Sequence, residues 1–184
     1  MTGARSQADS APRRAERVVR ITADVGEDVR RALAYLLRST DARPQTEAEV
    51  RSKLLGRDFD EETVDEALRH ARALRAVDDE AFARAWVEQR GLERGYGVAR
   101  VRQELRRRLV PEPLIDYALA ALEVRDDHSA AAELARRRLA QLPSSLAPEA
   151  LVRRLTAYLV RRGHPPTLAQ RVAIEISGID RDWD

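Results

Sequence analysis

The chain contains 184 residues, of which 43 % are hydrophobic, 35 % charged and only 4 % aromatic. The small aromatic content and the eight glycines argue against a β-sandwich and against a glycine-rich nucleotide-binding fold. The absence of cysteine excludes disulfides and thiolate metal sites. Alanine, leucine, arginine and glutamate predominate, and because these residues favour helices, we predict an all-α protein.

Positive and negative charges are nearly balanced. The 33 basic residues, all arginine except Lys53, stand against 31 acidic residues, so the formal net charge is +2. A surface for nucleic acid would therefore require local segregation of the arginines. No apolar run approaches the roughly 20 residues of a membrane helix, and the N-terminus lacks the apolar core of a secretory signal. We therefore expect a cytoplasmic protein that has no membrane partner.

In chain order, residues 1–26 are a basic arm without sustained helical periodicity, which we expect to be flexible. Helical periodicity then continues almost to the C-terminus, interrupted by prolines and by the sequence RGYG. The predicted helices form three groups of three, followed by a tail at 180–184. They are 28–39, 46–57 and 61–74 in repeat 27–77; 80–93, 98–109 and 113–124 in repeat 78–125; and 129–141, 148–162 and 167–177 in repeat 126–179.

Internal repetition is the basis of this division. A shift of 51 positions places the first repeat on the second without a gap, so that Arg51 meets Arg102 and Arg57 meets Arg108. A shift of 54 positions places part of the second repeat on the third. Because one unit of this size buries too little apolar surface alone, neighbouring repeats must stack. The predicted fold is an elongated or curved array of three tandem three-helix repeats.

The densest run of arginines lies in the predicted helix 98–109. At about 100° per residue, Val98, Val101, Leu105 and Leu109 gather on one stripe, which we expect to be buried. The polar residues share the remaining surface, and the third repeat carries two equivalent arginines. Arg100, Gln103 and Arg107 lie opposite the stripe, Arg102 and Arg106 flank them, Arg108 lies at the stripe's edge, and Arg154 and Arg161 are the equivalents.

This arginine face has two interpretations. Between Arg94 and Arg108 six arginines are accompanied by one acid, Glu104, which favours a binding role for the group. The alternative is a solvated surface, with Glu104 forming i,i+4 pairs to Arg100 and Arg108. The glycines around Tyr96 predict a tight turn with an exposed ring. The predicted partner-binding set comprises Arg94, Tyr96, Arg100, Arg102, Gln103, Arg106, Arg107, Arg108, Arg154 and Arg161.

No residues suggest metal binding or catalysis. The acidic pairs 78–79 and 126–127 precede helices, where aspartate caps free amides. His70, His128 and His164 are scattered, and we interpret them as surface or turn residues. The chain has no phosphate-loop motif, no cysteine nucleophile and no serine–histidine constellation. Trp86 and Tyr35 occupy equivalent positions and are predicted to be core anchors. We therefore expect no catalytic residue, cofactor or metal.

At these residues the sequence resembles a known family. The segments ALAYLLR, EAEVRSKLLGRDFDEETVDEAL, VDDEAFARAWVEQR and GYGVARVRQELRRRLVPEPLIDYAL, in that order, are similar to RecX, the bacterial regulator of the recombinase RecA. The resemblance covers most of residues 30–124 and extends more weakly to about 179. The chain departs from the family in having Arg108–Leu109 where a lysine–glycine pair is usual, and in a longer loop between its first two helices.

The resemblance implies three tandem three-helix units and a regulator without catalytic activity. Members of the family associate with the RecA–DNA filament in its groove and limit its growth, ATP hydrolysis and strand exchange. The implied partners are the RecA filament and single- or double-stranded DNA, bound weakly or through the filament, and we expect a monomer. Two alternatives remain open: a helical DNA-binding regulator that acts without a recombinase, and a helical scaffold that binds only proteins.

Overall fold

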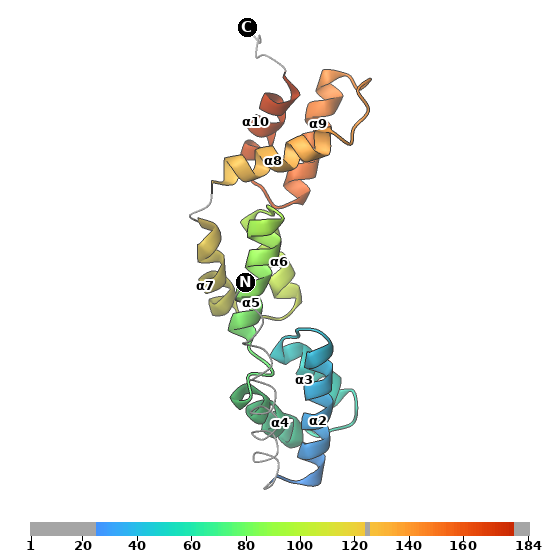
Figure 1. Cartoon of the computed structure of the whole chain (residues 1–184), viewed down its shortest axis with the longest axis vertical. Helices are drawn as coiled ribbons and strands as arrows, with labels where there is room; N and C mark the ends of the chain where they lie inside the picture. The colour runs from blue at the N-terminus through green and yellow to red at the C-terminus, as the bar shows by residue number, and fades with distance from the viewer. Residues whose placement is uncertain (1–24, 124–125, 179–184) are drawn as a thin grey trace, which may run out of the picture. The chain divides into compact units, whose positions relative to one another are not determined.

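The computed structural model describes residues 25–123 and 126–178, and all regular secondary structure in these ranges is helical (Figure 1). The all-α prediction is confirmed. The helices are α2 (Glu27–Ala42), α3 (Glu47–Leu55), α4 (Glu61–Ala73), α5 (Asp79–Val87), the π-helix η1 (Glu88–Glu93), α6 (Val98–Arg107), α7 (Glu112–Glu123), α8 (Asp127–Leu139), α9 (Pro148–Arg161) and α10 (Pro166–Ser177). Most of the predicted arm 1–26 and the tail 180–184 lie outside the described residues.

Short polar side chains start several helices. The Thr46 hydroxyl accepts a hydrogen bond from the Glu49 amide, and the Glu49 carboxylate accepts one from the Thr46 amide. Asp78 and Asp126 accept from the amides of Ala81 and His128 at 2.9 and 3.0 Å. Such side chains satisfy amides that a helix leaves unpaired at its start. The capping role predicted for Asp78 and Asp126 is confirmed.

The chain divides into two compact units, Met1–Phe82 and Ala83–Asp184. In the first, α2, α3 and α4 pack around an apolar core that includes Leu33, Leu54 and Leu68, each fully buried. Burial of this apolar stripe from three short helices is what stabilises the group. Asp79, predicted as a cap of its own helix, contributes to this unit, since its carboxylate accepts a hydrogen bond from the Glu47 amide at 2.8 Å.

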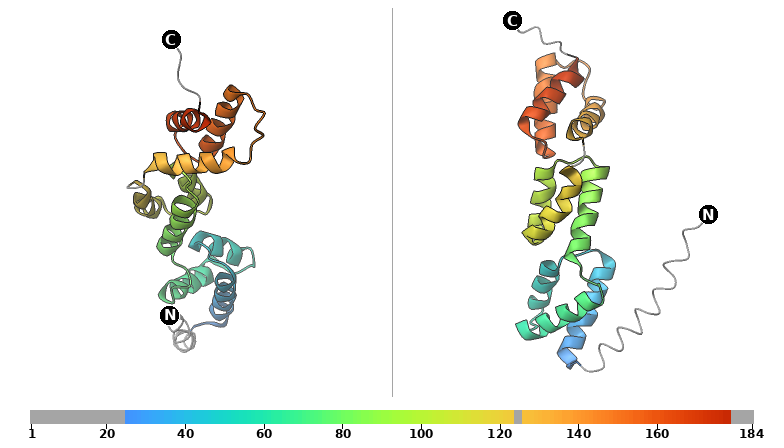
Figure 2. Two further views of the ribbon diagram at one scale, coloured as in Figure 1. Left: turned by 45° about the horizontal axis from the view of Figure 1, so that its top comes forward. Right: turned by 90° about the vertical axis from the view of Figure 1, so that its left-hand side faces the viewer.

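The second unit contains the C-terminal half of α5, from Ala83, and all of η1 to α10. Val101 and Leu105 of α6 are fully buried, and in the last three helices Leu159 and Val172 are buried as well. α9 and α10 lie side by side in both views of Figure 2. The helix predicted at 80–93 is confirmed as α5 followed directly by η1, and its second half is π-helical. There Gly91 packs so closely on Leu122 that an added Cβ would lie 2.6 Å from its Cδ2.

The second helices of the three repeats end alike. Each is followed by one residue in the left-handed conformation: Asp58 with φ 62°, Leu109 with φ 58° and Gly163 with φ 89°. These three positions are related by the shifts of 51 and 54 that relate the sequences. The left-handed turn carries Leu109 away from the buried stripe, so its side chain is 64 % exposed and the prediction of burial is wrong. The exact repeat limits, 27–77, 78–125 and 126–179, stay predictions.

Candidate partner-binding surface

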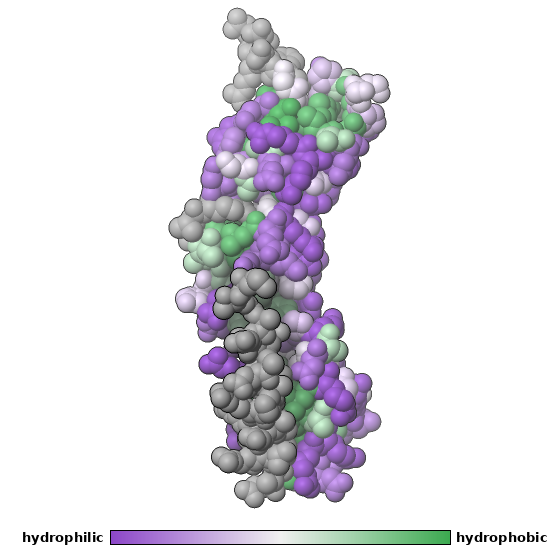
Figure 3. All heavy atoms as spheres, viewed as in Figure 1, coloured by the Kyte–Doolittle hydropathy of each residue, from purple (hydrophilic) through white to green (hydrophobic). Residues whose placement is uncertain are grey.

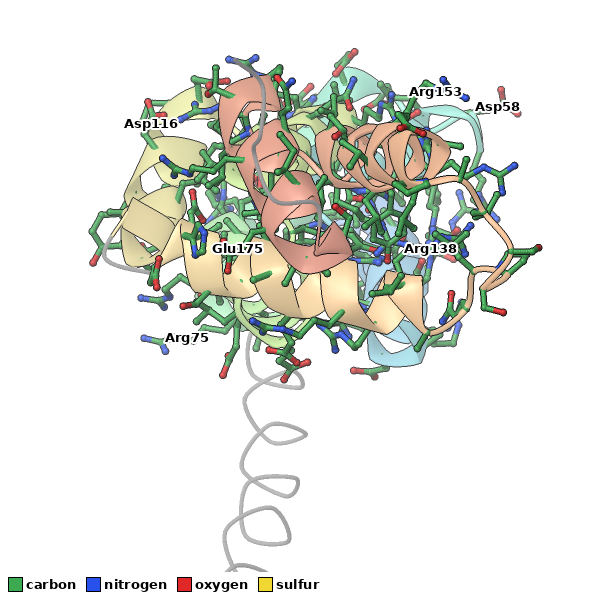
Figure 4. The ribbon with its side chains drawn as sticks, turned by 90° about the horizontal axis from the view of Figure 1, so that it is seen from above. Asp58, Arg75, Asp116, Arg138, Arg153 and Glu175 are labelled. Carbon is green, nitrogen blue, oxygen red and sulfur yellow. The ribbon has the colours of Figure 1, made fainter. Side chains whose placement is uncertain are left out.

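Two arginines of the predicted set connect α6 to α7. Arg102 Nη1 donates to Glu112 Oε1 and to Asp116 Oδ1, both at 2.5 Å, and Asp116 is labelled on α7 in Figure 4. Arg106 donates to both oxygens of Glu112, at 2.9 and 2.8 Å. The hydrogen bond from Arg106, followed by that from Arg102, lowers the pKa of Glu112. The two guanidinium groups are therefore already paired with carboxylates of the next helix.

The same arrangement occurs one repeat earlier. Arg51 of α3, the equivalent of Arg102, pairs with Glu61 at 2.8 Å and with Asp65 of α4. The hydrogen bond to Asp65 is the main cause of the raised pKa of Arg51. An arginine that binds two carboxylates in both repeats serves to connect helices within the repeat. The segment 94–108 contains one acid for six arginines, but two of these arginines, Arg102 and Arg106, are paired with carboxylates of the following helix.

Tyr96 lies in a contact between the second and third repeats, within the second unit. Its side chain is only 8 % exposed, so the predicted exposed ring is wrong. The guanidinium carbons of Arg100 and Arg162 lie 4.5 and 5.0 Å from the ring centroid. Arg100 also donates to Glu104 and, through Nη1, to the backbone oxygen of Arg161, both at 2.9 Å. Such cation–π contacts and charge-assisted hydrogen bonds orient Arg100 toward the protein itself.

Two glycines bring the backbones together at this contact. The Gly97 amide donates to the Arg162 oxygen at 2.9 Å. A Cβ on Gly97 would lie 2.2 Å from the Gly163 oxygen, and one on Gly163 would lie 2.5 Å from the Arg100 nitrogen. His164 is 2 % exposed, and its Nε2 lies 3.0 Å from the Gly95 oxygen, so its prediction as a surface or turn residue is wrong with respect to exposure. We call residues 95–97 and 162–164 together the loop junction.

The sequence contains one signal for the loop junction, which is a pair of glycines. Both loops hold a glycine next to the end of an arginine-rich helix, GYG before α6 and RGH after α9. Two backbones can approach closely where neither carries a Cβ, so two such glycines in adjoining repeats indicate a contact between their loops. Only the folded chain shows that these two loops meet.

Trp86 is half-buried, and two arginines, Arg90 and Arg108, stack on its ring. Its indole N–H donates to Glu104 Oε2 at 3.1 Å, and the guanidinium carbons of Arg90 and Arg108 lie 4.7 and 4.9 Å from the ring centroid. In the first repeat, Arg57 lies 3.9 Å from the centroid of the Tyr35 ring, which packs against the core. The equivalent pairs Arg57–Tyr35 and Arg108–Trp86 therefore hold the end of the second helix on the first helix of each repeat.

The remaining residues of the predicted set are open to solvent. In the described parts of the chain, their side chains form no hydrogen bond or ion pair within the protein. They are Arg94, Gln103, Arg107, Arg154 and Arg161, all exposed. We call the four arginines among them the open arginines. In Figure 3 the side chains over α6 are predominantly hydrophilic.

Geometry supports a surface role for the open arginines. Arg154 and Arg161 are seven residues apart on α9, two helical turns, so they lie on one face about 10 Å apart. A guanidinium that no carboxylate of its own chain occupies keeps its five donors for phosphate or carboxylate oxygens.

Other site chemistries find no support in the described parts of the chain. No group of three or more His, Cys, Asp or Glu residues there is arranged to hold a metal ion. Among the described helices, none combines the length and the apolar character that crossing a bilayer requires.

Comparison with known proteins gives one consistent result. Residues 30–70 match the family model "RecX, first three-helix domain", and residues 78–119 match "RecX, second three-helix domain". The regulatory protein RecX of Thermobifida fusca (strain YX) is 34 % identical over 156 residues, which cover 83 % of this chain and 84 % of that protein. That of Mycobacterium sp. (strain KMS) is 36 % identical over 151 residues, covering 80 % and 82 %.

Solved structures agree in fold. The crystal structure of RecX from Lactobacillus salivarius superposes with a TM-score of 0.67 at 16 % identity, covering 84 % of this chain and all of that one. A second crystal structure, titled regulatory protein RecX, gives a TM-score of 0.61 at 23 % identity, covering 93 % and 78 %. At these identities the superpositions show a shared three-dimensional fold.

Proposed function

The chain belongs to the RecX family of regulatory proteins, and from this premise we propose that it is a non-catalytic negative regulator of RecA. It binds the RecA–DNA filament in the cytoplasm and limits filament extension, ATP hydrolysis and strand exchange. It acts as a monomer, and it contacts single- or double-stranded DNA weakly or through the filament. The observation that carries the proposal is the set of open arginines on a chain of this family.

The division among the arginines supports a binding surface. Arg100, Arg102 and Arg106 are paired within the chain and hold its helices together. Arg107 lies on α6 as they do, whereas Arg154 and Arg161 lie on α9, and all three face solvent without such pairs among the described residues. Guanidinium groups in this state gain most from an anionic partner, because no internal pair has to be broken.

Binding alone accounts for the inhibition. A protein held on the filament occupies surface that incoming subunits and the second DNA strand need. If its affinity differs between filament states, it also shifts their populations and so changes ATP turnover. No catalytic group of the chain enters this mechanism.

The test replaces Arg107, Arg154 and Arg161 by glutamate. We expect the concentration of the protein that half-inhibits RecA ATPase on single-stranded DNA to rise roughly tenfold or more. The matched control replaces the exposed Arg30, Arg38 and Arg43 of the first unit in the same way. Both variants lower the net charge by the same amount, so only the place of the change differs. Normal inhibition by the first variant, with unchanged circular dichroism, would contradict the proposed surface.

A salt titration separates this function from that of a DNA-binding regulator. A protein that neutralises several phosphates loses affinity log-linearly with salt concentration. We expect binding to bare DNA to be weak, and binding to the RecA filament to be much stronger at the same salt concentration. Tight, steeply salt-dependent binding to bare DNA without any effect on RecA ATPase would favour the regulator that acts without a recombinase.

A further inference from the structure

Leu109 is exposed in a backbone conformation that leucine rarely adopts. Its φ is 58°, in the left-handed region, and its side chain is 64 % exposed. In that region the Cβ of an L-residue approaches the following carbonyl oxygen, which disfavours every residue except glycine and, to a smaller degree, asparagine and aspartate. Leu109 is therefore unfavourable both for its backbone and for its apolar surface in water.

The equivalent positions in the other repeats avoid this cost. Gly163 has no Cβ, and Asp58 has the short polar side chain that the left-handed region tolerates. Asp58, labelled in Figure 4, projects away from the ribbon. The fold thus requires the left-handed turn at all three positions but does not require leucine. The turn itself therefore does not explain a leucine at position 109.

The turn at Gly163 shows what this element of the fold can bind. There the Gly97 amide donates to the Arg162 oxygen, and the two backbones meet without side chains between them. The equivalent turn of the second repeat contains Arg108 and Leu109. A leucine at this place excludes such a close backbone contact and instead offers an apolar side chain. A molecule that docks on this turn must therefore provide a pocket.

The charges beside Leu109 indicate the kind of pocket. Arg106 is paired with Glu112, whereas Arg107 is exposed and has no partner in the described part of the chain. Phosphate oxygens offer no favourable contact to a leucine side chain, whereas a protein pocket with carboxylates at its rim accommodates both the leucine and the guanidinium.

We propose that Leu109 is an apolar anchor that inserts into a pocket of a partner protein, with Arg107 facing carboxylates at the rim. The inference rests on the proposed function, in which the partner is a RecA subunit. It assigns protein, and not DNA, to the C-terminal end of α6. Full burial of a leucine side chain that is otherwise exposed corresponds to a change in affinity of about tenfold or more.

The test uses Leu109→Gly in the full chain. Glycine relieves the backbone, so the melting temperature should stay the same or rise, while affinity for RecA on single-stranded DNA falls about tenfold or more. Leu109→Met keeps an apolar side chain and should retain affinity. Leu92→Ala removes another exposed leucine, 48 % exposed on η1, and should change nothing. A purely structural role cannot combine higher stability with weaker binding.

Each outcome decides a different point. If the wild-type chain inhibits RecA and Leu109→Gly binds equally well, the anchor is refuted and the proposed function stands. If Leu109→Gly loses as much affinity for bare single-stranded DNA as for the RecA filament, Leu109 meets nucleic acid and the inference is overturned. If the wild-type chain neither binds nor inhibits RecA, the proposed function fails, and the anchor fails with it.

Discussion

The second helices of the first and second repeats, α3 and α6, agree at the residues that hold each repeat together and differ at the residues that face solvent. Val50 and Leu54 correspond to Val101 and Leu105, all fully buried. Arg51 and Arg102 each bind two carboxylates of the next helix. The positions after them diverge in chemistry. Leu55, Gly56 and Asp58 of the first repeat correspond to Arg106, Arg107 and Leu109 of the second.

The difference separates structural arginines from those available to a partner. An arginine present in both repeats with the same carboxylate partners is explained by the repeat itself. Arg107 and Leu109 have no such counterpart, and both are exposed at the end of α6. Duplicated units that keep their core and change their surface provide an internal control, because each position in one repeat has a reference in the other.

The N-terminal ends of the two helices should respond very differently to substitution. Gly97→Ala places a Cβ 2.2 Å from the Gly163 oxygen. Because this atom belongs to the backbone and cannot move away by a rotamer change, we expect a loss of about 3 kcal/mol in the free energy of unfolding. The equivalent residue of the first repeat is Thr46, and Thr46→Ala should cost about 1 kcal/mol through loss of the cap. Urea denaturation followed by circular dichroism measures both.

The control for Gly97→Ala is Gly26→Ala. An added Cβ on Gly26, the N-cap of α2, meets no atom within 4 Å, so this variant should lose no more than the roughly 1 kcal/mol that alanine costs at an N-cap. Equal stabilities for Gly97→Ala and Gly26→Ala would show that the loop junction does not form in solution. In that case the two repeats of the second unit would be joined by the chain alone.

Much of the fold followed from the sequence because it depends on local and periodic signals. Apolar spacing predicts every described helix, and the shift of 51 residues places Arg51 on Arg102. The contact partners of individual arginines could not be predicted from the sequence. Whether Arg102 meets solvent or Asp116 depends on how α7 packs on α6, and the burial of Tyr96 depends on a loop 66 residues later, at Arg162. Periodicity within one helix contains no information about such contacts.

Position 53 offers a second comparison of the two helices. Lys53, the only lysine, donates through Nζ to the side-chain oxygen of Gln45, which is 3 % exposed, and lies 3.4 Å from Ser39 Oγ. Its equivalent in α6 is Glu104. Lys53→Met leaves the buried Gln45 oxygen without this donor, and we expect a loss of about 1–2 kcal/mol in unfolding free energy.

Arg69→Met is a suitable control for Lys53→Met, because it removes a cation of the same unit that is 61 % exposed and paired only along its own surface. Its stability should stay close to that of the wild type. A loss for Lys53→Met no greater than that for Arg69→Met would mean that Lys53 is an ordinary surface charge. The loop 43–46 between α2 and α3 would then be held by the hydrogen bonds from Gln45 to Ser39 and not by Lys53.

Arg106→Leu gives α6 the residue of α3 at this position, and its effect should be the smallest. The hydrogen bond from Arg106 is the largest cause of the lowered pKa of Glu112. A carboxyl whose pKa is lower in the folded chain stabilises it above the unfolded pKa, and that stability is lost as pH falls through the folded pKa. Arg106→Leu should therefore raise the pKa of Glu112 in carbon NMR titrations and make unfolding free energy less dependent on pH in the acid range. An unchanged pKa of Glu112 in the variant would mean that Arg102, and not Arg106, lowers this pKa. In both repeats a single arginine, Arg51 or Arg102, would then join the second helix to the third.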